Sequence, residues 1–388
     1  MPRMTRKTHP EPASTAAKTI RRIGILTGGG DAPGLNAVIC SVVHRAQSAY
    51  GWEVVGSEDG FEGLVQPPRN AKVVRLDIER VRDIAPRGGS ILGCSNVANP
   101  WAYPVRKGAG TRYIDMHATM LRNIRHHGID AMILVGGDGT MSMAKKIWEM
   151  GIPTVGVPKT IDNDLAGTDR TFGFDTALHH ATWAIDALHT TAHAHDRVMI
   201  AEVMGRHAGW IALHAGIAGR ADVVLIPEVP YDVGRVVSKI RSLGGRWSSY
   251  ALIVCAEGAL PRGGSTAVVR KAGKQVEGIV GHQAKLGGAG DHLKSMLEDK
   301  IEHEVRVTVL GHIQRGGSPT AFDRILAMRF GKSAVDLLAR GGFGRMVSLR
   351  TPHIVDVSLG DVVGKPHNVD PTGELVDVAR SLGIELGA

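Results

Sequence analysis

Residues 133–144, ILVGGDGTMSMA, carry an apolar run into a glycine-rich turn that contains a single carboxylate, Asp138. The apolar run predicts a buried strand, and MSMAKKIWEM at 141–150 predicts a helix directly after the turn. Glycines let backbone N–H groups approach an anion, and the N-terminus of a helix adds partial positive charge. A carboxylate beside such an anion site suits Mg²⁺, held directly or through water. The stretch therefore predicts one unit of a parallel sheet whose loops bind an anionic ligand.

The same alternation of strand and helix recurs along the chain. Apolar segments predicted to be strands lie at 23–26, 129–135, 152–157, 197–203, 221–226, 250–256 and 305–310, and long helices are predicted at 33–49 and 174–192. Apolar strands that alternate with helices favour parallel sheets covered on both faces. The glycine-rich segment 87–112 is expected to be mostly loop.

The composition is that of an ordinary globular protein with an excess of positive charge. Hydrophobic residues make up 43% of the 388 residues, and the formal net charge of +8 suits anionic ligands. Only 4% of residues are aromatic and no basic-aromatic motif occurs, so no nucleic-acid partner is expected. No run of 18 apolar residues is present, so no membrane partner is expected. Three cysteines without metal-ligand spacing favour a reducing cytoplasm, and residues 1–21 are expected to form a disordered basic tail.

Two further polar loops follow predicted strands: TGGGDAPG at 27–34 and PKTIDND at 158–164. The carboxyl ends of parallel strands meet at one edge of a sheet, where ligands gather. Asp162 and Asp164 in the second loop could act as a base and its orienting partner, or could merely form and cap the turn. Cations follow later in the chain, and each could bind a phosphate or remain a solvated surface charge: Arg197, Arg206, Arg306, His312 and Arg315.

Five longer segments resemble the phosphofructokinase family, and they occur in the family's order. They are GILTGGGDAPGLNA, LVGGDGT, PKTIDNDLAGTDRTFGFDTA, EVMGRHAGW and VLGHIQRGGSPTAFDRILA, and together they span most of residues 22–345. The motifs TGGGD, PKTIDND and MGRHAGWIALH are most similar to the bacterial subgroup that contains both ATP- and pyrophosphate-dependent members. The resemblance implies an α/β fold of two Rossmann-like parallel-sheet domains, with the active site in the cleft between them.

The resemblance also implies an activity. The expected enzyme is a glycolytic, cytoplasmic 6-phosphofructokinase that uses ATP and Mg²⁺ to phosphorylate D-fructose 6-phosphate at its 1-hydroxyl. Its alternative on the same scaffold is the reversible pyrophosphate-dependent phosphotransferase. Residues 22–173 and 313–345 are expected to form the donor domain, and residues 174–312 and 346–388 the sugar-phosphate domain.

Each residue that matches a family motif inherits an expected role. Asp162 is the expected general base, and Asp138 is expected to hold Mg²⁺. The expected donor site comprises Gly30, Gly137, Asp138, Gly139, Thr140 and Lys159. The expected acceptor site comprises Thr160, Ile161, Asp164, Arg197, Met204, Gly205, Arg206, Glu257, Arg306, His312 and Arg315. Arg197 and Arg306 resemble arginines that reach into a neighbouring subunit, which implies a homodimer or homotetramer with shared active sites.

Several positions depart from the family pattern, and two of them disagree about the phosphoryl donor. Gly139 resembles the ATP users, since the Asp of pyrophosphate users would fill and repel the space for a nucleotide's inner phosphate. Lys159 resembles the pyrophosphate users, where typical ATP enzymes have Gly. We give Gly139 more weight as evidence about the donor, because a side chain that fills and repels the phosphate space is harder to accommodate than an added cation. Asn96 stands where many relatives carry an arginine, and Asn cannot supply its charge.

Two positions on the first predicted helix also depart from the family pattern. Cys40 and His44 replace arginines that bind an effector phosphate in regulated bacterial relatives, so weak or no regulation by ADP or phosphoenolpyruvate is expected.

NAD and lipid kinases also carry a GGDGT loop, but they would lack PKTIDND, MGRHAGW and GHIQRGGSP. A catalytically dead regulatory subunit is disfavoured by the intact Asp138 and Asp162.

Overall fold

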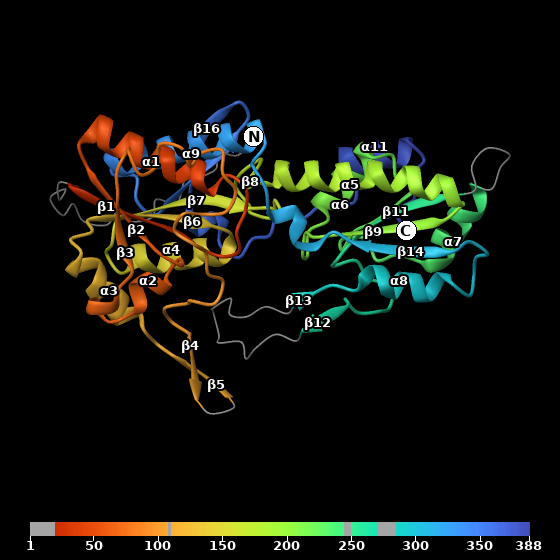
Figure 1. Cartoon of the computed structure of the whole chain (residues 1–388), viewed down its shortest axis with the longest axis horizontal. Coiled ribbons are helices and arrows are strands. Elements are labelled where there is room, and N and C mark those ends of the chain that lie inside the picture. Colours follow the sequence, from red (N-terminus) through yellow and green to blue (C-terminus); the bar gives the residue numbers. More distant parts are fainter. Residues whose placement is uncertain (1–19, 108–109, 244–249, 271–284) are drawn as a thin grey trace, which may run out of the picture.

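The larger of the two main sheets is mostly parallel and contains eight strands, in the order β16-β15-β7-β6-β1-β2-β3, with β8 paired to β7. The computed structural model describes residues 20–107, 110–243, 250–270 and 285–388 (Figure 1). The strands of this sheet are β1 (Arg22–Thr27), β2 (Glu53–Ser57), β3 (Val73–Leu76), β6 (Ala131–Gly136), β7 (Thr154–Thr160), β8 (Phe172–Gly173), β15 (Arg345–Arg350) and β16 (His353–Ser358). The sheet and its helices are called the first domain here.

The strand order of the first domain reverses beside β1. The chain passes from β1 to β2 on one side, and β6 pairs with β1 in parallel on the other side. Ligands of open α/β sheets bind at such reversals, outside the carboxyl ends of the strands. The glycine-rich turn around Asp138 follows β6, so it lies at this reversal.

Helices cover both faces of the first sheet and enclose two hydrophobic cores. One core lies under α1 (Leu35–Tyr50) and α9 (Ala321–Ala339), which pack along each other. The other core lies under α2 (Glu62–Val65), α3 (His117–His126), α4 (Asp138–Glu149) and α10 (Leu359–Val362), and the short 3₁₀ helix η1 (Pro68–Asn70) adjoins α3. Every residue of β6 is buried, as expected for a strand covered on both faces.

The smaller sheet has four parallel strands in the order β10-β11-β9-β14, and with its helices it forms the second domain (Figure 1). Its strands are β9 (Val198–Val203), β10 (Val223–Leu225), β11 (Ala251–Ala256) and β14 (Val305–Val309). Its helices are α5 (Phe174–His195), α6 (Trp210–Ala218), α7 (Val233–Ser242), α8 (Ala289–Leu297), α11 (Glu374–Ser381) and the 3₁₀ helix η2 (Gly311–Arg315). Two parallel-sheet domains confirm the predicted fold class.

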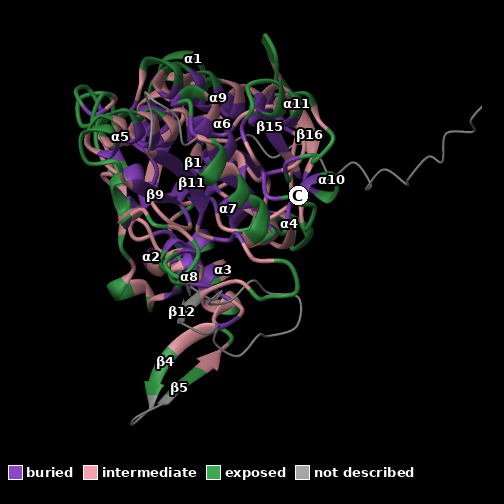
Figure 2. Cartoon of the chain, turned by 90° about the vertical axis from the view of Figure 1, so that its right-hand side faces the viewer, coloured by how far each residue is buried: buried purple, intermediate pink, exposed green. Residues whose placement is uncertain are grey.

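Two hairpins lie outside the sheets. The strands β4 (Tyr103–Lys107) and β5 (Gly110–Ile114) pair antiparallel and project from the first domain (Figures 1 and 2). The prediction of a loop over 87–112 is therefore wrong for its last third, where cross-strand hydrogen bonds that no local pattern signals form a ribbon. The second hairpin joins β12 (Val268–Arg270) to β13 (Lys285–Leu286).

The predicted domain boundary after residue 345 is misplaced. β15 pairs in parallel with β7, and β16 pairs with β15, so residues 345–358 belong to the first domain. The apolar side chains of β15 are buried because they extend the first core beyond β7. The chain returns to the second domain only through 364–369, after which α11 packs on α6.

Residues 1–19 of the predicted tail lie outside the described residues, and the Arg21 N–H donates to Asp130 Oδ2 at 2.9 Å. Among the described residues, none of the helices has the length and apolar character needed to cross a membrane.

Candidate active site

Two glycine-rich turns meet beside β1. The Gly28 N–H donates to the Val135 carbonyl at 2.8 Å, which ties loop 27–34 to the end of β6. The buried Thr140 packs between them, so that a Cβ on Gly28 would lie 2.6 Å, and one on Gly136 only 2.2 Å, from its Oγ1. Glycine is required at both positions because the backbones approach the threonine so closely. The two turns therefore form one continuous surface.

Asp138 stands at the N-terminus of α4, between Gly137 and Gly139. Its Oδ1 accepts a hydrogen bond from the Gly364 N–H at 2.9 Å, and all three residues around the turn are half-buried. Among the described residues, no group of three or more His, Cys, Asp or Glu could hold a metal ion by itself. One carboxylate completed by water and phosphate oxygens is an arrangement that Mg²⁺ commonly takes, so this turn fits a phosphate-bound Mg²⁺.

Two cations converge on loop 27–34 from opposite domains. Lys159, at the end of β7, is 3% exposed, and its Nζ donates to the Gly30 carbonyl at 2.5 Å. Arg315, at the end of η2, donates from Nη1 to the Asp31 carbonyl at 3.1 Å. Burial lowers the pKa of Lys159 to about 8, and the positive charge of Arg315 acts in the same direction. The loop is therefore lined with positive charge, as an anionic ligand requires.

Loop 160–164 places a buried carboxylate beside these cations. Asp162 is 4% exposed, and its Oδ1 has no hydrogen-bond partner in the protein. The Asp162 N–H donates to Thr160 Oγ1 at 3.1 Å, while Ile161 is buried in the core of the second domain. A buried polar atom without a partner costs free energy, so Oδ1 is suited to accept from a hydroxyl of a ligand.

Two further carboxyl groups share the environment of Asp162. Burial, together with the negative charge of Asp162, raises the pKa of Asp164 above its usual range, while Arg206 opposes the shift. The same two causes raise the pKa of Glu257 to about 7. Perturbed carboxyl groups that interact in this way are typical of functional sites.

The turn after β9 presents a guanidinium to these carboxylates. Gly205 and Arg206 have φ values of 138° and 52°, and the Arg206 N–H donates to Glu257 Oε1 at 3.1 Å. Arg206 Nη2 is buried and has no partner in the protein, which suits it to an anionic ligand. Met204 beside it is half-buried and packs on the core of the second domain. His312 is exposed on η2, the helix that carries Arg315.

Arg197 and Arg306 lie apart from this cluster. Both pair with Glu304, and the Arg197 Nε–Glu304 Oε2 distance is 2.5 Å. They lie at the amino ends of β9 and β14, whereas Arg206 follows the carboxyl end of β9. At roughly 3.3 Å per residue, the strand separates Arg197 from Arg206 by about 20 Å. Within one chain, the structure does not bring these two predicted residues to Asp162.

Sequence reasoning missed three contributors to the site. They are Asp31, whose carbonyl binds Arg315, Gly364, whose N–H binds Asp138, and His367, whose Nδ1 lies 3.1 Å from the Asn163 carbonyl. The TGGGD motif already pointed at Asp31. Gly364 and His367 have no local signal, because their partners lie about 200 residues earlier in the chain. The exposed Asn96 follows Ser95, whose carbonyl accepts from the Gly29 N–H at 3.0 Å, so it does border loop 27–34.

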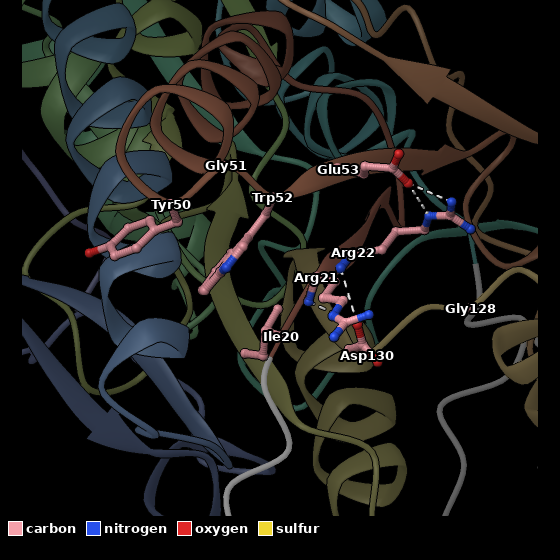
Figure 3. A pocket seen from close by; sticks show the side chains of 9 residues that line it. All are labelled: Ile20, Arg21, Arg22, Tyr50, Gly51, Trp52, Glu53, Gly128 and Asp130. Atoms are coloured by element: carbon pink, nitrogen blue, oxygen red, sulfur yellow. Dashed lines mark hydrogen bonds and ion pairs between the residues drawn. The ribbon is translucent and has the colours of Figure 1, made fainter.

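A cavity of about 710 Å³ lies at the opposite end of the first sheet, where β1 and β2 begin (Figure 3). Its charged groups already pair with each other: Arg22 Nε donates to Glu53 Oε2 at 2.7 Å, and Asp130 Oδ2 accepts from the Arg22 N–H at 3.1 Å. Ligands of parallel sheets bind at carboxyl ends, so this cavity is not the candidate active site.

Comparisons with known proteins agree with this geometry. An ATP-dependent 6-phosphofructokinase from Chloroflexus aurantiacus is 49% identical over 367 residues, covering 95% of this chain and 98% of the relative. A pyrophosphate–fructose 6-phosphate 1-phosphotransferase from Streptomyces coelicolor is 48% identical over 352 residues, covering 90% of this chain and 96% of the relative. A solved structure of phosphofructokinase from Saccharomyces cerevisiae matches with a TM-score of 0.71 and 29% identity, over 88% of this chain and 45% of that one.

The similarity extends over nearly the whole chain. The family described as Phosphofructokinase matches residues 22–338, which include every loop of the candidate site except the returning segment 364–369. The fold, the arrangement of the loops and the near-complete coverage of the relatives all agree. This chain belongs to the phosphofructokinase family.

Proposed function

We propose that this chain is an ATP-dependent 6-phosphofructokinase, which transfers the terminal phosphoryl group of ATP to the 1-hydroxyl of fructose 6-phosphate. The observation that carries the proposal is the buried, unpartnered Oδ1 of Asp162. It lies between a glycine-rich anion site on the first domain and the Arg206–Glu257 pair on the second. An acceptor hydroxyl bound there would meet both a base and a phosphoryl donor.

On the acceptor side, the two central roles use buried atoms without a partner in the protein, Asp162 Oδ1 and Arg206 Nη2. Asp162 takes the proton of the 1-hydroxyl as that oxygen attacks the phosphoryl group, and Asp164 and Thr160 orient the loop. Glu257 accepts from a sugar hydroxyl. Arg206 and Arg315, together with His312, bind anionic oxygens by charge-assisted hydrogen bonds. Ile161 and Met204 form the apolar backing of the loops.

On the donor side, the proposed groups are backbone amides and a cation. Gly30, Gly137, Gly139 and Thr140 border the phosphates, and Lys159 supplies positive charge beneath loop 27–34. Asp138 would hold Mg²⁺, which when bound supplies neutralisation of the charge on the phosphates. Because phosphoryl transfer depends on positioning and on stabilising spread-out charge, the chain needs no covalent intermediate.

Pyrophosphate remains the second candidate donor, because Lys159 is the residue expected in pyrophosphate users. The Lys159 Nζ already donates to the Gly30 carbonyl, so its charge has a partner on loop 27–34 whichever donor binds. Overall similarity does not separate the donors, since the two relatives are 49% and 48% identical. The proposal of ATP therefore depends on the small side chain at Gly139.

The deciding experiment supplies purified enzyme with fructose 6-phosphate and Mg²⁺, and with either ATP or pyrophosphate. We expect turnover with ATP, and turnover only with pyrophosphate would contradict the proposal. A Gly139→Asp variant tests the reason: its added carboxylate should lower kcat/KM for ATP by roughly a hundred-fold, through the steric block and like-charge repulsion. Unchanged use of ATP would remove Gly139 from the argument.

The proposed assembly is a homodimer or homotetramer in the cytoplasm. Arg197 lies about 20 Å from the carboxyl end of β9, which Arg206 follows. Arg306 pairs with Met199 near the same amino end, so in this proposal both arginines act on a neighbouring subunit's acceptor site. A cytoplasmic location fits an enzyme whose substrates are phosphorylated metabolites.

A further inference from the structure

Residues 364–369 form a crossing segment that leads from the first domain back to the second. At its start, the Gly364 N–H donates to Asp138 Oδ1 at 2.9 Å. At its end, the Val369 N–H donates to Glu228 Oε1 at 2.9 Å, and the same oxygen accepts from the Gly209 N–H at 2.9 Å. The segment therefore binds the turn around Asp138 at one end. At the other end it shares Glu228 with Gly209, the residue just before α6.

His367 occupies the middle of the crossing segment and makes two hydrogen bonds to loop 160–164. Its backbone N–H donates to the Asp164 carbonyl at 2.8 Å. Its Nδ1 lies 3.1 Å from the Asn163 carbonyl, and because a carbonyl only accepts, Nδ1 carries the proton in this contact. An isolated bridge between Leu165 and Pro366 continues the pairing.

His367 also contacts Trp210 of α6, the helix that follows the turn carrying Arg206. Its carbonyl accepts from Trp210 Nε1 at 2.7 Å, and the two rings lie 4.9 Å apart between centroids. Trp210 is the first residue of α6, four positions after Arg206. One histidine thus connects the turn that carries Arg206 to the loop that carries Asp162.

Loop 160–164 needs such support because Asn163, next to Asp162, has an unusual backbone conformation. Asn163 adopts a left-handed φ of 54°, and its Oδ1 accepts from the Thr171 N–H at 3.0 Å. Thr171 thus binds the loop through the Asn163 side chain, and His367 binds it through the Asn163 and Asp164 carbonyls. A left-handed residue persists only where its surroundings hold it in place.

We propose that His367 is a positioning residue: its Nδ1–H and its contact with Trp210 hold loop 160–164 so that Asp162 faces the acceptor hydroxyl. The inference rests on the proposed function for the role of Asp162, although the contact itself does not depend on the substrate. His367 makes hydrogen bonds with Asn163, Asp164 and Trp210, which flank the proposed base. Its effect should therefore appear in turnover more than in donor binding.

The experiment compares three substitutions with one control. His367→Phe keeps a ring against Trp210 but removes the donor, His367→Asn offers an N–H at the Nδ1 position, and His367→Gln offers one at the Nε2 position. The control is His353→Phe, at an exposed position on β16. Thermal unfolding of each variant shows whether it folds, and His367→Asn keeps the test decisive if His367→Phe does not.

We expect His367→Phe and His367→Gln to lower kcat roughly ten-fold with KM for the donor nearly unchanged, since misplacing a catalytic loop costs turnover. His367→Asn should recover most of the lost kcat, and the control should match the unmodified enzyme. Equal kcat in all variants, or no recovery in His367→Asn, would overturn the proposal.

Amide hydrogen exchange over 158–166, measured without substrate, separates this inference from the proposed function. We expect faster exchange in His367→Phe than in His367→Asn. If the unmodified enzyme does not phosphorylate fructose 6-phosphate with either donor, the proposed function fails, but the exchange difference still supports the positioning role. Identical exchange in the two variants would refute that role even if the enzyme is a phosphofructokinase.

Discussion

The two sheets of this molecule differ in the strands that form their edges. The first sheet has an antiparallel strand at each edge, β3 and β16, and a hydrophobic core on each face. The second sheet is wholly parallel, and its edge strand β14 ends in Val309, which is 54% exposed, shortly before Ile313, which is 67% exposed. An unpaired, partly apolar edge is a surface that proteins usually cover. In the proposed assembly, this edge of the second sheet is the surface that a partner subunit would cover.

The two domains also differ in the groups that they contribute to the candidate site. The first domain contributes mainly backbone, in the turns around Gly28 and Asp138, together with a buried lysine. The second contributes long charged side chains, Arg206 and Arg315, whose nitrogens reach toward the carboxylates and loop 27–34. The proposed donor side is thus built of closely packed backbone, and the proposed acceptor side relies on guanidinium groups. Three predictions sharpen this comparison.

The largest effect is expected at the base between the domains. Asp162→Asn keeps the size of the side chain but cannot take a proton, so kcat should fall roughly a thousand-fold. Equilibrium binding of fructose 6-phosphate should persist, because Arg206 and Arg315 are unchanged. Steady-state kinetics and calorimetry measure the two quantities. Turnover close to that of the unmodified enzyme would remove Asp162 from the base role.

A smaller effect is expected at the open edge of the second sheet. Arg306→Ala should raise KM for fructose 6-phosphate roughly ten- to hundred-fold, the range expected for one lost hydrogen bond to a charged group. The matched control is Arg340→Ala, because Arg340 is also exposed and pairs with an acid, Asp356, at the edge of the first sheet. The control should leave KM unchanged.

Co-expression of Arg306→Ala with Asp162→Asn tests whether Arg306 acts across subunits. A mixed oligomer would combine an intact Asp162 from one chain with an intact Arg306 from the other. At a fructose 6-phosphate concentration well below the KM of Arg306→Ala, activity well above that of either variant alone is therefore expected. No gain in the mixture would contradict action across subunits, and an unchanged KM in Arg306→Ala would place the arginine outside the site.

The smallest effect is expected in the pH profile of the donor site. Burial lowers the pKa of Lys159 to about 8, so the side chain is charged below this pH and neutral above it. In the free enzyme, kcat/KM for the donor should fall several-fold as pH rises through about 8, because the loop then loses a positive charge. Lys159→Arg should keep its charge to higher pH and shift this limb upward. An identical alkaline limb in Lys159→Met would show that another group causes it.

Local pattern was enough to predict the strands that carry the site. The loops at Gly28, Asp138 and Asp162 follow apolar runs, and the parallel topology brings the ends of those runs together. The hairpin β4–β5 and the membership of β15 and β16 in the first sheet were not predicted, because pairing across the chain decides them. The roles of His312, Arg197 and Arg306 stay predictions, since within one chain they lie exposed or at the far end of β9.

The amino-acid sequence by itself determined the family and the two-sheet architecture, and it supplied the residue types of the proposed site, because the spacing of glycines, carboxylates and apolar runs is local information. Only the tertiary structure decided the state of those residues. Burial lowers the pKa of Lys159 and leaves Asp162 Oδ1 without a partner, and a return of the chain some 200 residues later places His367 against Asn163. Desolvation and long-range contacts depend on what packs around a residue, which no short stretch of sequence encodes.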